Sequence, residues 1–452
     1  MQKVLRIAAT AGLLSVAAAP AHAFCGFYVA KADGKLFNKA SKVVVARKDQ
    51  RTVVTMASDY QGDPKEFALV VPVPTVITKS QIHITENALI DHVDAYTAPR
   101  LVEYFDPDPC APNLKFSMSA AAVGGVAPAA RARQESAQAL GVTIEAEYSV
   151  GEYDIAILAA TQSDGLTTWL NAEGYKIPAG AAPVLGSYIK QGMKFFVARV
   201  NLKEKDKLGF RYLRPISVAY ETEKFMLPIR LGTVNANGPQ DMLVFMLTEK
   251  GRVETTNYRT QQIPSNLNVP VFAKTEFGNF YKAMFDTLVK KDGMKAVYTE
   301  YAWNMGWCDP CAADPIPTAK LVELGAFWLA SQGGQPPGIF RGRGFPGGAQ
   351  AAYVTRLHVR YDAQSFPEDL MFHETADTGN FQGRYVLNHP FTGEITCTGA
   401  ADYQKRITAR RAEEAENIAR LTGWEMSTIK QKMTLATVEK PWFEKMWGST
   451  NK

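Results

Sequence analysis

Five cysteines are the residues of this 452-residue chain that are best suited to covalent chemistry: Cys25, Cys110, Cys308, Cys311 and Cys397. In an oxidising compartment such residues favour disulfides over metal thiolates, so all five are disulfide candidates. If Cys308 pairs with Cys311, the remaining three cysteines allow three different single bridges and leave one thiol over. The sequence does not choose among these pairings.

The Cys308–Cys311 pair has a spacing that allows redox chemistry. Trp307 precedes it, and the segment Trp-Cys-Asp-Pro-Cys is locally similar to the Trp-Cys-x-Pro-Cys motif of thioredoxin-type oxidoreductases. Two cysteines at this spacing can bond across a tight turn, and their reactivity depends on how far one thiolate is stabilised. One hypothesis is therefore a thiol-disulfide oxidoreductase in which Cys308 attacks and Cys311 resolves.

The residues around this pair favour a structural disulfide instead. Pro315 and Pro317 delay the next helix until about Thr318, so no helix N-terminus lowers the pKa of the first cysteine. Asp309 and Asp314 carry negative charges that would raise a thiolate pKa. We therefore expect a structural bridge, with the redox pair as the alternative.

Arg356, His358 and Arg360 form a second candidate site. On a strand, alternation places these three side chains on one face and the apolar residues between them on the other. A stripe of three cations could bind a carboxylate, a phosphate or a sulfated sugar. The favoured interpretation is a solvated face whose cations pair with acids such as Glu368 and Asp369.

Other kinds of site have no signal. The chain lacks HExxH, GxSxG, SxxK and GxGxxG in their required settings, so no metal site and no cofactor are predicted, and catalytic residues remain unknown. The composition is typical of globular proteins, with 46% hydrophobic and 21% charged residues. The formal net charge is only +5 and the sequence shows no dense basic face, so no nucleic-acid partner is predicted.

The first 23 residues have the layout of a secretory signal peptide. Lys3 and Arg6 precede an uncharged run over 7–19, and Ala21-His22-Ala23 forms an A-x-A cleavage site before Phe24. The apolar run is too short to span a bilayer, and no later segment supplies a transmembrane run. We expect cleavage after Ala23 and a periplasmic or secreted mature protein.

The elements that position these residues are strands and helices in alternation. A strand, turn and strand are expected over 42–54, with the turn at 47–50. Further strands are expected at 67–76, 153–159, 194–200, 215–220, 225–231, 242–248 and 296–303, and helices at 163–174, 181–191, 277–288, 318–330 and 403–421. Two prolines in 67–76 predict an edge strand or a strand exit. The expected fold is α+β, with mainly antiparallel strands, several packed helices and two or three closely associated subdomains.

The predicted division of the chain follows these elements. After the signal peptide (1–23) come a β-rich part (24–142) with an Ala/Gly-rich insert at about 116–141, an α/β part (143–262), an α+β part (263–400) with the CxxC pair and a Gly-rich loop at 331–350, and a helical tail (401–452).

Several sequence blocks resemble a known family. DPKEFALVVPVP (63–74), GMKFFVARVNL (192–202), YAWNMGWCDPCAADP (301–315) and FPEDLMFHET (366–375) are similar to the bacterial family called domain of unknown function 2330, and the resemblance covers roughly residues 24–424. It implies a bacterial envelope or secreted protein and brings no activity. The predicted function is a non-enzymatic binding or scaffolding protein stabilised by disulfides, whose partner is an envelope protein or an anionic ligand.

Overall fold

The computed structural model describes residues 27–30, 37–61, 67–111, 142–160, 163–332 and 351–436, except positions 174, 176, 179, 202, 205–206, 208–212, 235, 237, 308 and 310–314. The predicted signal peptide, Cys25, the Ala/Gly-rich insert and all but the first two residues of the Gly-rich loop lie outside these residues, as do the last 16 residues of the chain.

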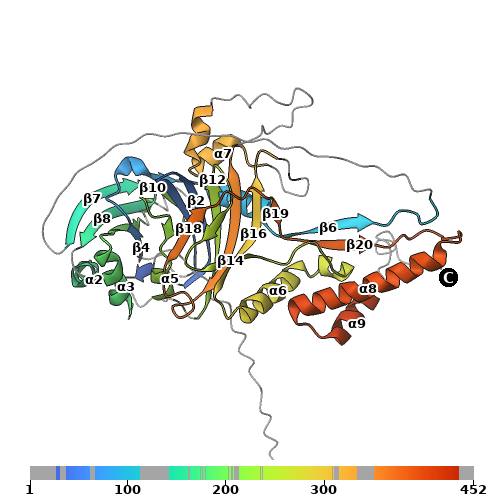
Figure 1. Ribbon diagram of the computed structural model, residues 1–452. Helices are drawn as coiled ribbons and strands as arrows, with labels where there is room; N and C mark the ends of the chain where they lie inside the picture. The colour runs from blue at the N-terminus through green and yellow to red at the C-terminus, as the bar shows by residue number, and fades with distance from the viewer. Residues whose placement is uncertain are drawn as a thin grey trace, which may run out of the picture.

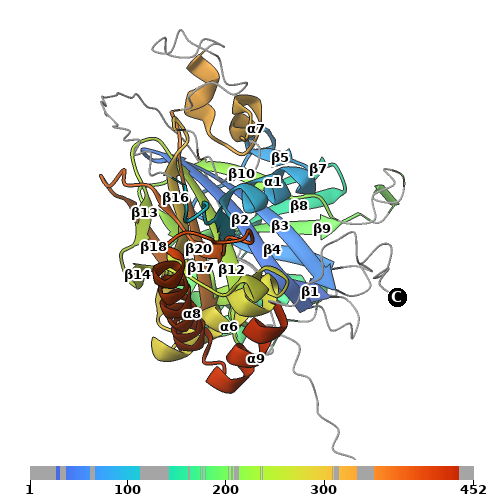
Figure 2. The ribbon, with the colours of Figure 1, turned by 90° about the vertical axis from the view of Figure 1, so that its right-hand side faces the viewer.

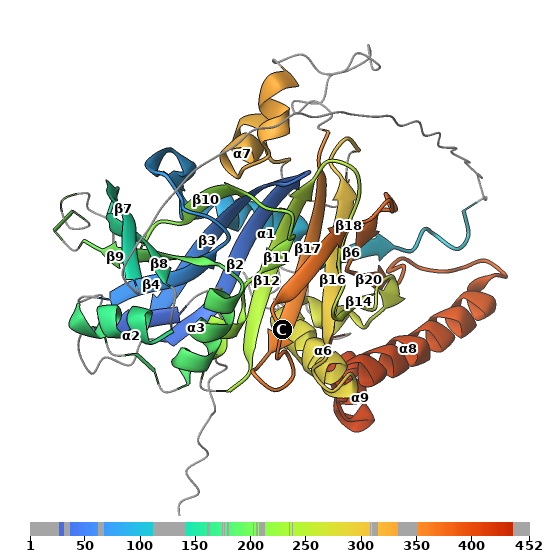
Figure 3. The same cartoon turned by 60° about the vertical axis from the view of Figure 1, so that its left-hand side comes forward.

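Two β-sheets pack face to face, and helices cover the outer face of each sheet (Figure 1, Figure 3). Alternation along the strands produces this arrangement. On β2 (Phe37–Lys48), Val43 and Val45 join the core between the sheets, while Val44 and Ala46 join the core under the helices. Because both faces are buried, the inner strands are continuous apolar runs.

The larger sheet is mixed and holds the three predicted cations Arg356, His358 and Arg360 on one of its strands. Its order is β14 (Arg259–Gln262), β16 (Ala296–Asn304), β17 (Tyr353–Tyr361), β12 (Gln240–Thr248), β2, β3 (Arg51–Gln61), β10 (Ile216–Glu221) and β5 (Ile82–Ile84), and β19 (Phe381–Gln382) also pairs with β16. β12 runs parallel to β2 and antiparallel to β17, so β17 lies inside the sheet between β16 and β12.

The second sheet is antiparallel, with the order β1 (Phe27–Ala30), β4 (Phe67–Val73), β9 (Lys194–Val200), β8 (Tyr153–Ala160) and β7 (Val142–Val150). The expected edge position of β4 is wrong, because β1 and β9 flank it. β1 pairs only with Phe67–Val70, however, so Pro72 lies beyond this pairing and needs no amide hydrogen to bond with β1. The alternative expectation, a strand exit, describes the end of β4 that pairs with β9 alone.

Two small sheets complete the β-structure. β11 (Met226–Leu227), β18 (Leu370–Glu374) and β13 (Val253–Thr255) form one, and β15 (Leu267–Asn268), β20 (Arg384–His389) and β6 (Arg100–Phe105) form the other. β20 and β6 are parallel along six residues each and project beyond the large sheet (Figure 1).

Helices close the outer faces in three groups. α2 (Ser163–Ala172), α3 (Ala181–Lys190) and α5 (Arg230–Val234) lie on the second sheet. α1 (Asn87–Thr97), α7 (Thr318–Glu323) and the 3₁₀ helix η3 (Phe327–Gln332) cover one part of the large sheet, and α6 (Phe277–Lys291), α8 (Ala400–Thr422), α9 (Met426–Ala436) and η2 (Val271–Lys274) form the third group (Figure 2). One further 3₁₀ turn, η1 (Lys79–Gln81), precedes β5.

The predicted α+β class is confirmed, and helices occur in all five expected segments, with 318–330 divided between α7 and η3. The large sheet takes strands from each of the three predicted parts, 24–142, 143–262 and 263–400. These parts are therefore closely associated, and their boundaries stay a prediction.

Candidate functional site

Cys308 and Cys311 lie outside the described residues, but Asp309 between them is described and buried. Its Oδ2 atom accepts hydrogen bonds from the Tyr301 hydroxyl at 3.1 Å and from the Gln382 amide at 2.8 Å. Burial is the main cause that raises the pKa of Tyr301, and the negative charge of Asp309 raises it further. The Asp309 carboxylate is thus bound to β16 and β19.

The helix after the CxxC pair begins where the sequence predicts. α7 starts at Thr318 with Pro317 as its N-cap, and residues 315–317 are not helical. A helix that begins seven residues after Cys311 does not place its N-terminal partial charge directly behind the motif, which is the arrangement that lowers a thiolate pKa. This position matches the expected interruption.

The cation stripe lies on one face of β17, as predicted. Leu357 and Val359 point into the core between the sheets, so Arg356, His358 and Arg360 point toward the outer helices. The predicted solvated face is wrong: the Phe285 ring of α6 stacks on the His358 ring, with centroids 3.7 Å apart. β17 is an inner strand, and α6 covers it.

The predicted partners of the stripe are also wrong. Asp369 instead pairs with Arg230, and Glu368 accepts from the Asn257 amide. The acids that pair with the stripe come from α1, β12, α6 and β16, and they are Asp94, Asp241, Asp286 and Glu300. Arg360 binds Asp241, its cross-strand neighbour, through Nε and Nη2 at 2.7 Å each.

Glu300 is the centre of this ionic network. It is fully buried and contacts Arg356, the His358 Nδ1 atom at 2.6 Å, and the Tyr281 hydroxyl, which donates to it. Burial alone would raise the pKa of Glu300, but the charges of Arg356 and His358 outweigh it and lower the pKa to about 2. Burial would lower the pKa of His358, yet Glu300 and Asp241 raise it. An incoming anion would have to displace these carboxylates to reach the stripe.

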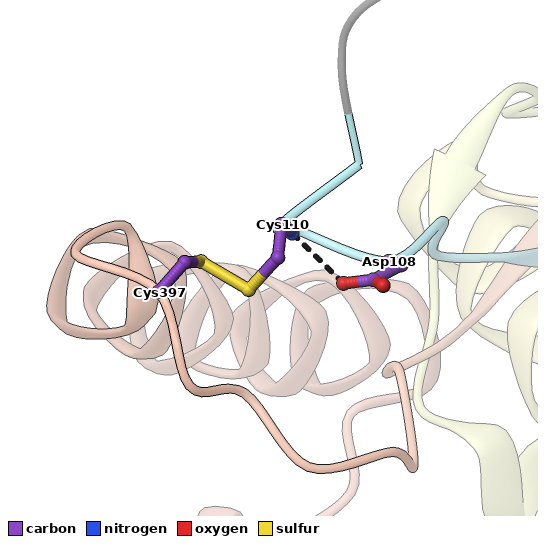
Figure 4. Close-up of a disulfide and its surroundings, with 3 residues drawn as sticks. All are labelled: Asp108, Cys110 and Cys397. Carbon is purple, nitrogen blue, oxygen red and sulfur yellow. Dashed lines mark hydrogen bonds between the residues drawn. A yellow bond between two sulfur atoms is a disulfide. The ribbon is translucent and has the colours of Figure 1, made fainter.

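A disulfide joins Cys110 to Cys397, which are 287 positions apart in sequence and whose Cα atoms are 5.7 Å apart (Figure 4). This is one of the three bridges left open by the sequence. The Asp108 carboxylate accepts a hydrogen bond from the Cys110 amide at 2.8 Å and shapes the turn after β6. The bridge therefore connects the end of β6 to the segment that enters α8.

A pocket of about 540 Å³ lies between the ends of β6 and β20, η2, α8 and α9. We call it the α8 pocket. Its apolar walls include Phe105, Val271, Phe272, Phe391 and Met433. The Phe105 side chain is 70% exposed, and one face of its ring stacks on His389 with centroids 4.4 Å apart. Clefts of this size with apolar walls and a few polar groups are typical of small-molecule sites.

Glu414 of α8 lines this pocket and is only 4% exposed. Within the described part of the chain, its Oε1 atom has no hydrogen-bond partner, and the Arg410 Nε atom is 3.7 Å away. Burial raises the pKa of Glu414 to about 7, against the opposing charges of Arg410 and Arg411. A carboxyl in a pocket with such a shift is a candidate functional group.

The neighbouring Arg410 is already neutralised. Its Nη1 and Nη2 atoms donate to the two oxygens of Asp106 at 2.9 and 2.8 Å, and the Tyr403 hydroxyl donates to the same carboxylate at 2.7 Å. These hydrogen bonds, led by the one from Arg410, lower the pKa of Asp106. Arg411 is exposed on the pocket and, among the described residues, has no hydrogen-bond or ion-pair partner.

The sequence did not single out the pocket residues. One signal does exist for Glu414: it lies seven residues after Ile407, four before Ile418 and seven before Leu421, so it occupies the apolar face of α8. A carboxylate on that face needs a partner or a raised pKa. Phe105, His389 and Arg411 come from separate elements and leave no such pattern.

In the described residues, no group of three or more His, Cys, Asp or Glu side chains could hold a metal ion. No helix among them is long and apolar enough to cross a membrane.

Comparison with known proteins gives one match. The model of a family described as "Uncharacterized protein conserved in bacteria (DUF2330)" matches residues 19–373, which is more than half of the chain. No curated protein and no solved structure matches the sequence or the fold. The family match ends before β20, α8 and α9, so nine of the 14 residues that line the α8 pocket lie beyond it.

Proposed function

Because the chain belongs to the bacterial family called domain of unknown function 2330, whose description names no activity, we propose from the chain's own features that it is an exported, non-enzymatic binding protein. Its ligand site is the α8 pocket. The observation that carries this proposal is Glu414, a nearly fully buried carboxyl that lines an open pocket and has one oxygen with no hydrogen-bond partner in the described part of the chain. Buried polar atoms usually have partners, so an atom without one in a pocket is suited to a ligand.

The bridge between Cys110 and Cys397 supports both parts of the proposal. A disulfide persists in an oxidising compartment, which agrees with export through the signal peptide over residues 1–23. It also holds the end of β6 against the entry to α8, so two walls of the pocket keep their spacing before a ligand arrives. Such preorganisation lowers the entropy cost of binding.

The alternative function is a thiol-disulfide oxidoreductase acting through Cys308 and Cys311. The late start of α7 at Thr318 gives it no support. A glutathione redox titration of this pair distinguishes the two functions. A potential below about −300 mV indicates a structural bridge, whereas a value between roughly −120 and −270 mV with mixed-disulfide formation supports the oxidoreductase.

Binding is tested with calorimetric titration of the purified protein against small apolar carboxylates, amines and neutral analogues. We expect at least one class to bind, and Val271→Trp, which fills the pocket from η2, to weaken that binding tenfold or more. Ile144→Trp is the matched control, because Ile144 is exposed on β7, away from the pocket. Binding that is unchanged in Val271→Trp, or no binding at all, contradicts the proposed site.

A further inference from the structure

We propose that the α8 pocket takes a small apolar molecule with a single carboxylate, which lies between Glu414 and the guanidinium of Arg411, a group without a partner among the described residues. This inference rests on the proposed function, since it assumes that the pocket is a binding site, and it adds the chemical class of the ligand. Three features of the pocket lead to it: the walls, the charge balance and the state of the Glu414 carboxyl.

The walls select for an apolar body. Val271, Phe272 and Met433 come from η2 and α9, and Phe391 follows β20. Each of these side chains removes apolar surface of a ligand from water, which favours binding. The exposed ring of Phe105 adds a flat surface at the end of β6.

The charge balance selects for an anion. Asp106 and Arg410 neutralise each other through two hydrogen bonds. His389 is paired with Glu103 at 2.8 Å. The groups that remain in the pocket are Glu414 and the positively charged Arg411. Arg411 would repel a ligand amine, whereas it would attract and neutralise a ligand carboxylate.

The charged groups of the other elements do not alter this balance. Lys274 of η2 is paired with Glu103 and Lys432 of α9 with Glu276, so neither is left as a free cation. On α8, Glu413 is exposed and accepts from the Asn268 amide at 3.4 Å.

The Glu414 carboxyl gives the ligand a hydrogen bond. With a pKa near 7, Glu414 is about half protonated at neutral pH, and its proton can be donated to a ligand carboxylate. A hydrogen bond from an acid to a carboxylate is of the strong, charge-assisted type. If the ligand binds only the protonated form, the apparent affinity follows the protonated fraction and falls about tenfold between pH 6 and pH 8.

The test uses two matched pairs of probes, N-acetylphenylalanine with its amide and octanoate with octanol, titrated calorimetrically at pH 6, 7 and 8. We expect each carboxylate to bind at least tenfold more tightly than its neutral partner at pH 6, and to lose about tenfold in affinity by pH 8. Glu414→Gln should keep binding through its amide donor but abolish the pH dependence. Arg411→Ala should weaken the carboxylates tenfold or more and leave the neutral probes unchanged.

Arg406→Ala is the control for Arg411→Ala, because Arg406 is exposed on the same helix and does not line the pocket. Tighter binding of neutral or amine compounds, blocked by Val271→Trp, would overturn the carboxylate assignment while the binding function stands. Carboxylate binding that is indifferent to both Glu414→Gln and Arg411→Ala would overturn it as well. If no compound of any class binds, both the inference and the proposed function fail.

Discussion

Replacing Glu414 with Gln should make the protein more stable at pH 8 and change how its stability depends on pH. Glu414 is nearly fully buried, and burial raises its pKa from 4.5 to about 7. A difference of one pKa unit corresponds to about 1.4 kcal/mol, so the shift amounts to about 3 kcal/mol of unfavourable burial of the ionised form.

The sign follows from proton binding. Between pH 4.5 and pH 7 the folded protein holds a proton on Glu414 that the unfolded chain has released. Stability falls with rising pH wherever the folded state binds more protons, so this group lowers the free energy of unfolding progressively across that window and by its full amount above pH 7. Gln is neutral at every pH. The stability of Glu414→Gln relative to the native protein should therefore rise by about 3 kcal/mol from pH 4.5 to pH 8.

The assay is urea unfolding followed by tryptophan fluorescence, for both proteins at pH 4.5, 6 and 8. Other titrating groups, His358 among them, act equally in both proteins and cancel in the difference. Glu416→Gln controls for the loss of one negative charge from α8, because Glu416 is exposed on the same helix. A difference between Glu414→Gln and the native protein that stays within 0.5 kcal/mol over this pH range, roughly the scatter of independent sites, would refute the reasoning.

Three further predictions concern the framework. Replacing both Cys110 and Cys397 with Ser opens the loop between two cysteines 287 positions apart, and the loop-entropy relation predicts a loss of about 6 kcal/mol, measured as a lower urea midpoint; an unchanged midpoint contradicts it. Glu300→Ala removes a fully buried partner of Arg356 and should cost about 3–5 kcal/mol in the same assay, whereas a cost under about 1 kcal/mol shows that the network adds little. Asp309→Ala removes the acceptor of two buried hydrogen bonds and should cost about 1–3 kcal/mol, with faster proteolysis around residue 309; unchanged cleavage counts against it.

Local patterns predicted the elements well because they depend on neighbours in sequence. Phe280, Met284 and Phe285 recur at helical spacing, and they are buried on α6. Alternation correctly placed Arg356, His358 and Arg360 on one face of a strand. In each case the periodicity of the backbone decides which side chains share a face.

Contacts between distant segments could not be predicted in the same way. The acids that neutralise the stripe are 56 to 262 residues away from it in sequence, so proximity along the chain pointed to the wrong acids, Glu368 and Asp369. Cys110 and Cys397 are likewise joined only by the fold. The α8 pocket combines five separate elements, and only Glu414 leaves a trace in sequence, as a carboxylate on an apolar helix face.

Glu300 and Glu414 show why partners distinguish a structural carboxyl from a candidate functional one. Both are almost completely buried, yet the pKa of Glu300 is lowered to about 2 and that of Glu414 is raised to about 7. Glu300 has Arg356, His358 and Tyr281 around it, so its charge is fully compensated inside the fold. The one cation within 4 Å of Glu414 in the described residues is Arg410, which already binds Asp106. A buried carboxyl without a compensating charge lowers stability, and an apolar side chain would pack equally well in its place. Because Glu414 lines an open pocket, we expect a ligand to provide the partner that it lacks among the described residues.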